Sequence, residues 1–120
     1  MVLDFGRLRT MNELRCARWH PGGVGGWSLS DWAVAMAGEA GEACNVVKKL
    51  NRERDSLVGN RETATDLRAA LAKELADTVI YLDLLAAAAG IDLGEAVTAK
   101  FDEVSVKHGF PERLGAPASD

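Results

Sequence analysis

Two long segments of this chain, residues 30–54 and 66–89, repeat apolar residues at intervals of three and four. This spacing places the apolar residues on one face of an α-helix, whereas a half-buried strand would alternate strictly. Two shorter segments, residues 5–19 and 92–108, have mostly the same spacing, and no stretch indicates a convincing strand. The sequence therefore predicts an all-α fold with four helices.

Local signals set the expected ends of these helices. Ser30 is a good N-cap for the second helix, and Gly90 is a suitable residue to end the third. Asp92 followed three residues later by Glu95 resembles a capping box for the fourth helix. Four glycines and a proline within residues 20–27 predict that this segment has no regular structure.

The chain has 120 residues, which suits one domain, residues 1–120, built as a four-helix bundle-like unit. The tail, residues 109–120, has two prolines and few residues able to pack, so we expect it to be flexible. A composition that is 48% hydrophobic and 27% charged is typical of a folded, soluble chain. The net charge of -4 argues against binding to a nucleic acid polymer.

Cysteine content and apolar runs bear on location. The chain has only two cysteines, Cys16 and Cys44, and their spacing does not suggest a disulfide framework. Its most apolar stretch, residues 78–91, is interrupted by Asp83 and is too short to span a bilayer. The first residues also lack the apolar core of a signal peptide. We expect a soluble, cytoplasmic protein with no membrane partner.

Acidic residues occur where the helical pattern predicts apolar ones. Glu39 and Glu42 lie three residues apart, inside and at the edge of the apolar stripe of the second helix. Glu74 and Asp77 repeat this arrangement on the third helix. A glycine precedes each glutamate of the first pair, although each glycine costs about 1 kcal/mol relative to alanine inside a helix. Two helices are therefore each predicted to present an acidic pair toward the interior.

Four carboxylates brought together in a low-dielectric interior cannot all stay charged without a cation. A set of oxygen ligands favours Mg²⁺, with Mn²⁺ as a possible substitute. No histidine follows a glutamate by three residues, which argues against a di-iron site. Gly38 and Gly41 would allow a ligand to approach closely. The simpler alternative is that the acidic pairs are solvated helix faces.

The order E39-x-x-E42 and then E74-x-x-D77 resembles the signature of the MazG-like, all-α nucleoside triphosphate pyrophosphohydrolases. The flanking blocks AGEAGEACNVVKKL, ELADTVIYLDLLA and KFDEVSVKHGFPERL are similar as well. The resemblance covers about residues 27–114. One departure is the separation of the acidic pairs, because residues 43–73 intervene and include an extended polar connection.

This resemblance implies Mg²⁺-dependent hydrolysis of a nucleoside triphosphate to the monophosphate and pyrophosphate. The triphosphate would be a deoxynucleotide or an aberrant nucleotide. Such an activity would serve nucleotide pool sanitation. Glu39, Glu42, Glu74 and Asp77 would bind the metal, and Glu39 and Glu42 would be catalytic. We expect Glu42 to be the general base because it lies at the edge of the stripe. Two alternatives remain: a non-enzymatic helical interaction module, or a hydrolase of another phosphorylated compound.

Six residues are candidates for binding the substrate. The aromatic ones would lie against the base, or serve as core residues. The asparagine would contact the sugar or the base, and the lysines would contact phosphates. The alternative is that the asparagine and the lysines are ordinary surface residues. The candidates are Trp27, Asn45, Lys49, Tyr81, Lys100 and Lys107.

The third helix is apolar on nearly all of its faces, and such a helix must be buried on all of them. A single small chain cannot supply that cover, so we expect a homo-oligomer. A second subunit would also wall the nucleotide site, with Trp27 or Lys107 of one chain completing the pocket of the other. The resemblance implies a homodimer or a dimer of dimers. One apolar side comprises Leu75, Val79 and Leu82, and another comprises Ile80, Leu84 and Ala88.

Overall fold

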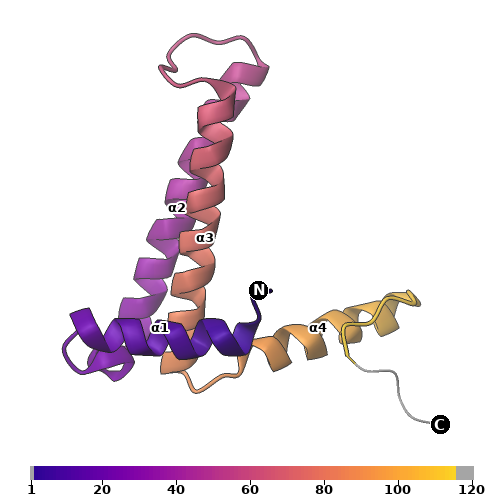
Figure 1. The fold of residues 1–120 in the computed structure, drawn as a ribbon. Helices are drawn as coiled ribbons and strands as arrows, with labels where there is room; N and C mark the ends of the chain where they lie inside the picture. Colours follow the sequence, from indigo (N-terminus) through magenta and orange to yellow (C-terminus); the bar gives the residue numbers. More distant parts are fainter. Residues whose placement is uncertain (1, 116–120) are drawn as a thin grey trace.

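The computed structural model describes residues 2–115, and these residues form helices and no strands. The prediction of an all-α fold is therefore confirmed for this part of the chain. Figure 1 shows the arrangement of the elements. They are α1 (Phe5–Trp19), the short 3₁₀ helix η1 (Gly23–Gly26), α2 (Leu29–Arg54), α3 (Ala64–Ala88) and α4 (Leu93–His108).

The cap of α2 differs from the expected one. Ser28, and not Ser30, is the N-cap, and its side chain accepts a hydrogen bond from the backbone N–H of Asp31. Asp31 in turn accepts a hydrogen bond from the backbone N–H of Ser28. This reciprocal capping box satisfies two N–H groups that the helix leaves unpaired, whereas Ser30 lies inside the first turn.

The glycine-rich segment is also more regular than expected. Gly23–Gly26 form η1, so the prediction that residues 20–27 lack regular structure is wrong. The Trp32 indole N–H donates a 2.9 Å hydrogen bond to the carbonyl of Val24. Because Trp32 is fully buried, this bond ties η1 to the start of α2.

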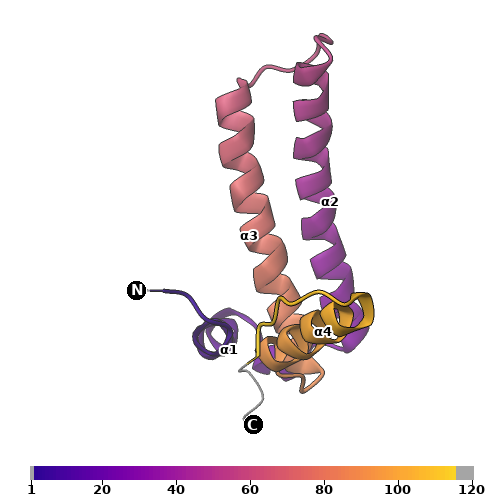
Figure 2. The same ribbon diagram turned by 90° about the vertical axis from the view of Figure 1, so that its right-hand side faces the viewer.

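α2 and α3 form a long hairpin, and α1 crosses its base (Figures 1 and 2). The hydrophobic core lies at this base, where α1, η1, α2 and α3 meet. The polar connection at the far end is held to α2 by Asn60, whose amide donates to the carbonyl of Lys49. The core is built on buried Cys16, Trp32 and Leu84, with Val24, Ile80, Tyr81, Leu85 and Ala88 packed against them.

A buried polar cluster joins α1 to α3. Asp83 is fully buried, and its two carboxylate oxygens accept hydrogen bonds of 3.1 Å from Arg9 and from Asn12. Asn12 also donates to the carbonyl of Ile80, and Arg9 donates to that of Ile91. The interruption of the apolar stretch is therefore a buried ion pair that orients α1 on α3.

α4 points away from the hairpin, and the chain after it runs back along the helix (Figures 1 and 2). The Asp102 carboxylate accepts hydrogen bonds from the backbone N–H groups of Leu114 and Gly115, at 2.7 and 3.1 Å. The first part of the expected flexible tail is therefore anchored to α4. Residues 116–120 lie outside the described residues.

The four helices do not surround one common core within a single chain. The radius of gyration is 18.0 Å, whereas a compact domain of this length would have a value of about 14 Å. α1, α2 and α3 pack together, and α4 extends outward with its contacts to α1. In the described part of the chain, no helix is both long and apolar enough to cross a membrane.

Candidate functional site

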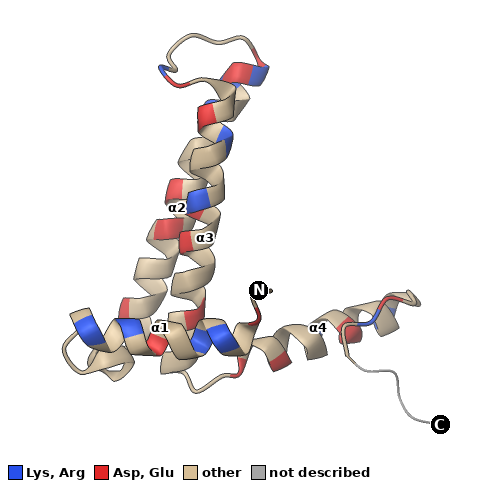
Figure 3. Cartoon of the chain, in the orientation of Figure 1, with Lys and Arg blue, Asp and Glu red and all other residues tan. Residues whose placement is uncertain are grey.

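The hairpin brings the two acidic pairs together partway along its length, where red segments of α2 and α3 adjoin in Figure 3. Glu39 of α2 and Glu74 and Asp77 of α3 each place one carboxylate oxygen within 4.8 Å of the other two. All three side chains belong to half-buried residues. Glu42 is exposed at the edge of this triad and interacts with both glutamates.

Crowding and burial raise the pKa of two of these acids, Glu39 and Glu74. Burial raises the pKa of Glu39, and the negative charges of Glu42 and Asp77 raise it further. Burial also raises the pKa of Glu74, followed by a hydrogen bond to Glu42 and the surrounding negative charges. One carboxylate oxygen of Glu74 is shielded from water and has no hydrogen-bond partner in the described chain. A proton or a cation would relieve both features.

These donors fit a hard divalent cation. All are carboxylate oxygens, which Mg²⁺ and Mn²⁺ prefer, and none is a thiolate or imidazole. The shielded oxygen of Glu74 provides an independent reason to expect a ligand, because a buried acceptor without a partner is costly. The residues present therefore suit the predicted metal, and Glu42 is placed to join them from the exposed side.

The raised pKa values predict how the stability of the metal-free protein depends on pH. A carboxyl group with a higher pKa in the folded chain binds protons more tightly when folded, so it stabilises the fold at low pH. That contribution is lost as the pH rises from the ordinary glutamate range through the raised value. We expect Glu74→Gln to raise the melting temperature relative to wild type more at about pH 7 than at about pH 4. Calorimetry in EDTA measures the rise in melting temperature at both pH values. A rise of the same size at both would contradict the electrostatic account.

A cavity of about 220 Å³ lies between α1 and α3 and extends to the acid cluster. Asp77 and Tyr81 line it from α3, so it connects one predicted metal ligand with one predicted base contact. Arg15 supplies a cation on the α1 side, and Trp19 supplies an exposed aromatic ring. The full lining is Asn12, Arg15, Cys16, Trp19, Asp77, Ile80, Tyr81 and Leu84.

The sequence interpretation missed the residues that α1 contributes to this cavity. Asn12, Arg15 and Trp19 recur at intervals of three and four, so they share one face of the helix. That spacing was a signal, but it did not show that this face would lie against α3. The contact depends on pairing between residues far apart in the chain.

The predicted aromatic contacts occupy different environments. Trp27 is 38% exposed and packs edge-on against Trp32, with ring centroids 4.6 Å apart, and against His20 at 4.7 Å. This packing corresponds to the alternative in which Trp27 anchors the core. Tyr81 is half-buried, with its ring 6.3 Å from that of Trp32, and it lines the cavity beside Asp77.

The remaining substrate candidates are not gathered at the cavity within one chain. Asn45 is exposed on α2, one turn beyond Glu42. Lys49 pairs with Glu62 at 3.0 Å, which fastens the connection between α2 and α3. Two further lysines, Lys100 and Lys107, belong to α4, which points away from the hairpin in Figure 1.

Comparisons with protein-family models, with curated proteins and with solved structures gave no match to this chain.

Proposed function

We propose that this protein hydrolyses a nucleoside triphosphate to the monophosphate and pyrophosphate in a Mg²⁺-dependent reaction. The observation that carries the proposal is the convergence of Glu39, Glu74 and Asp77, with Glu42 beside them, at the end of a cavity with an aromatic wall. The resemblance of the acidic pairs and their flanking blocks to MazG-like enzymes supports the same activity. It also suggests a deoxynucleotide or an aberrant nucleotide as substrate.

The four acids would hold the metal, which when bound would neutralise charge on the phosphate oxygens. Water hydrolyses the anhydride between the α and β phosphates, so one pyrophosphate leaves for each monophosphate formed. Glu42 is the residue best placed to accept a proton from this water, because it is exposed and adjoins the cluster. Glu39 and Glu74 are more buried and serve as ligands.

The cavity between α1 and α3 would receive the nucleoside. Its volume of about 220 Å³ is small for a whole nucleotide, so the triphosphate would extend over the acids. Tyr81 and Trp19 offer aromatic surfaces for the base, since stacking on aromatic side chains stabilises a bound base. Arg15 would balance negative charge at the side of the cavity opposite Asp77.

We further propose that the enzyme acts in the cytoplasm to keep the nucleotide pool free of unwanted triphosphates. Both cysteines are free thiols, which agrees with a reducing compartment. We also propose that the protein is a homo-oligomer, because apolar residues of α3 remain exposed in the single chain.

A nucleotide panel tests the activity. The protein is incubated with ribonucleoside and deoxyribonucleoside triphosphates in Mg²⁺ or in EDTA, and pyrophosphate and orthophosphate are measured separately. We expect pyrophosphate release that requires Mg²⁺ and favours some bases. Release of orthophosphate alone would indicate a hydrolase of another class. A complete lack of turnover would favour a non-enzymatic interaction module.

Tyr81 offers a test of the base contact. We expect Tyr81→Phe to keep most activity, because the ring remains, and Tyr81→Ala to raise KM by about 10-fold or more through the loss of stacking. Steady-state kinetics on the best nucleotide and thermal unfolding of the same variants separate the two effects. If Tyr81→Ala lost stability without a matching rise in KM, Tyr81 would be a core residue and not a base contact.

A further inference from the structure

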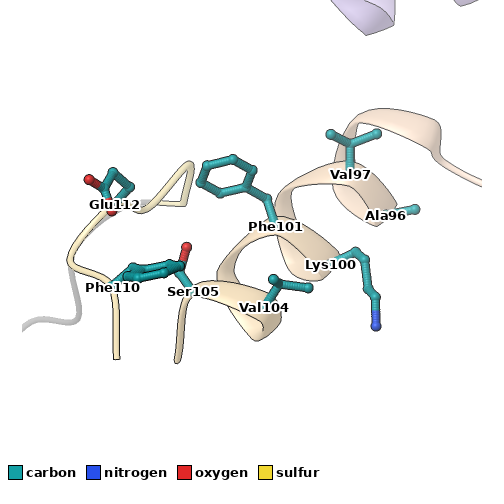
Figure 4. Close-up of a pocket in the computed structure, with 8 residues that line it drawn as sticks. All are labelled: Ala96, Val97, Lys100, Phe101, Val104, Ser105, Phe110 and Glu112. Carbon is teal, nitrogen blue, oxygen red and sulfur yellow. The ribbon is translucent and has the colours of Figure 1, made fainter. Parts of the chain in front are cut away.

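The base of a bound nucleotide would be recognised by residues close to the acid cluster. A cavity of about 640 Å³ lies along α4, between the helix and the segment that folds back over it (Figure 4). Its lining includes Val97, Phe101, Val104 and Phe110 but none of the four acids. The cavity of about 220 Å³ between α1 and α3, which we call the α1–α3 cavity, is lined by Asp77. The residues of the α1–α3 cavity are therefore the ones that would distinguish one base from another.

Asn12 lines the α1–α3 cavity, and the fold fixes the direction of its side-chain amide. The residue is only 4% exposed, and its amide nitrogen donates to the carbonyl of Ile80 at 2.9 Å and to the carboxylate of Asp83 at 3.1 Å. That carboxylate also pairs with Arg9 at 3.1 Å. A carbonyl and a carboxylate can only accept hydrogen bonds. The amide therefore cannot turn over, because its oxygen would then face two acceptors.

The amide oxygen of Asn12 remains available to a ligand. Among the described residues, both hydrogen bonds of this side chain are made by its nitrogen. The shielded side-chain atoms without a partner belong to Asn60 and Glu74, so the oxygen of Asn12 is still accessible. Asn12 lines the α1–α3 cavity and an adjoining one that shares Arg15 with it. The oxygen is therefore a fixed acceptor that faces this joined space.

A hydrogen-bond donor lies beside this acceptor. Arg15 follows Asn12 by three residues, so both lie on one face of α1, and Arg15 lines the same cavity. A guanidinium only donates hydrogen bonds. Cytosine matches this order, because its amino group donates and the adjacent ring nitrogen accepts. Uracil and thymine have the opposite order, with a carbonyl in place of the amino group and an N–H in place of the ring acceptor.

We propose that Asn12 selects a cytosine nucleotide as the substrate of this site. Its oxygen accepts a hydrogen bond from the exocyclic amino group, Arg15 donates to the ring nitrogen, and Tyr81 stacks on the ring. Uracil and thymine are disfavoured because their carbonyl would face the Asn12 oxygen. Adenine has the same order of groups as cytosine, but its two rings are larger and the cavity is small. This inference rests on the proposed hydrolysis and names its substrate.

A comparison of dCTP with dUTP tests the selection on the wild-type protein. The two nucleotides share the sugar, the triphosphate and the ring size, and they differ only in the groups that Asn12 and Arg15 would contact. We expect kcat/KM for dCTP to exceed that for dUTP by about 30-fold or more, since dUTP would leave the Asn12 oxygen without a donor. Equal values of kcat/KM for the two nucleotides would overturn the proposal.

Binding of the monophosphates separates base selection from hydrolysis. In Mg²⁺, dCMP and dUMP have no anhydride to hydrolyse, and titration calorimetry measures their affinities. We expect dCMP to bind about 10-fold more tightly or better. Preference for dCMP with no turnover of any triphosphate would support the selection and contradict the hydrolysis. Pyrophosphate release with equal turnover of dCTP and dUTP would contradict the selection alone. Absence of both binding and turnover would overturn both.

Asn12→Ala tests the residue itself. We expect kcat/KM for dCTP to fall by about 10-fold or more relative to that for dUTP, because the variant lacks the acceptor for the amino group. A merely structural role for Asn12 would lower both values by the same factor, and an unchanged ratio would therefore overturn the assignment. Asn51→Ala, the same change at an exposed position of α2, is the matched control and should keep the wild-type ratio. Circular dichroism confirms that both variants keep their helices.

Discussion

Replacing Glu74 with Gln is expected to lower Mg²⁺-dependent turnover by about 100-fold or more, because it removes a charged ligand from a site that stabilises phosphate charge. The substitution keeps the size of the side chain, so the hairpin should still form. Glu74 is also the residue whose shielded oxygen lacks a partner in the described chain. Initial rates of pyrophosphate release measure the effect.

The matched control is Glu53→Gln, which makes the same chemical change on an exposed residue near the end of α2. We expect this variant to retain wild-type turnover. Thermal unfolding in the presence and absence of Mg²⁺ adds a readout that does not depend on catalysis, because a ligand that binds the folded state stabilises it. Wild type should gain stability on addition of Mg²⁺, and Glu74→Gln should gain little. Full turnover by Glu74→Gln would contradict the assignment of the metal ligands.

Asp83→Ala is expected to reduce the free energy of unfolding by about 3 kcal/mol, because it leaves a partly buried arginine without its counter-ion. The Asp83 carboxylate is fully buried and accepts hydrogen bonds from Arg9 and Asn12 at 3.1 Å. Urea denaturation followed by circular dichroism measures the loss. The double variant Arg9→Met/Asp83→Leu should recover part of it, since both charges are then removed together.

An exposed pair provides the control for the buried one. Lys100 and Glu103 also lie 3.1 Å apart, but both side chains are more than two-thirds exposed. Glu103→Ala should therefore change the free energy of unfolding by less than about 1 kcal/mol. Similar losses for Glu103→Ala and Asp83→Ala would show that burial does not distinguish the two pairs.

The sequence best predicted the long helices with a repeated apolar spacing and the features that depend only on neighbouring residues. Periodicity over α2 and α3 predicted both helices to within two residues at each end. Of the four acids expected to converge, Glu39, Glu74 and Asp77 do so, whereas Glu42 is exposed at the edge of the cluster. The capping of α4 by Asp92 and the glycine after α3 were also correct, because caps depend only on neighbouring residues.

Features that depend on distant residues could not be predicted in the same way. In the sequence, Asp83 only interrupts an apolar segment. Its ion pair could not be predicted because its partner Arg9 lies 74 residues earlier in the chain. Periodicity also gave no direction for α4, which the structure places beyond the contact between α1, α2 and α3. In the glycine-rich segment, composition argued against regular structure, but the hydrogen bond from Trp32 to Val24 holds a turn of 3₁₀ helix.

Phosphorus NMR of the reaction with the preferred nucleotide is the most direct test of the claim that these four acids support pyrophosphohydrolysis. With Mg²⁺ and wild-type protein, we expect one monophosphate and one pyrophosphate for each triphosphate consumed. The same spectrum should show almost no conversion with Glu74→Gln or in EDTA. Formation of a diphosphate and orthophosphate, or equal conversion without Mg²⁺, would contradict the proposed function.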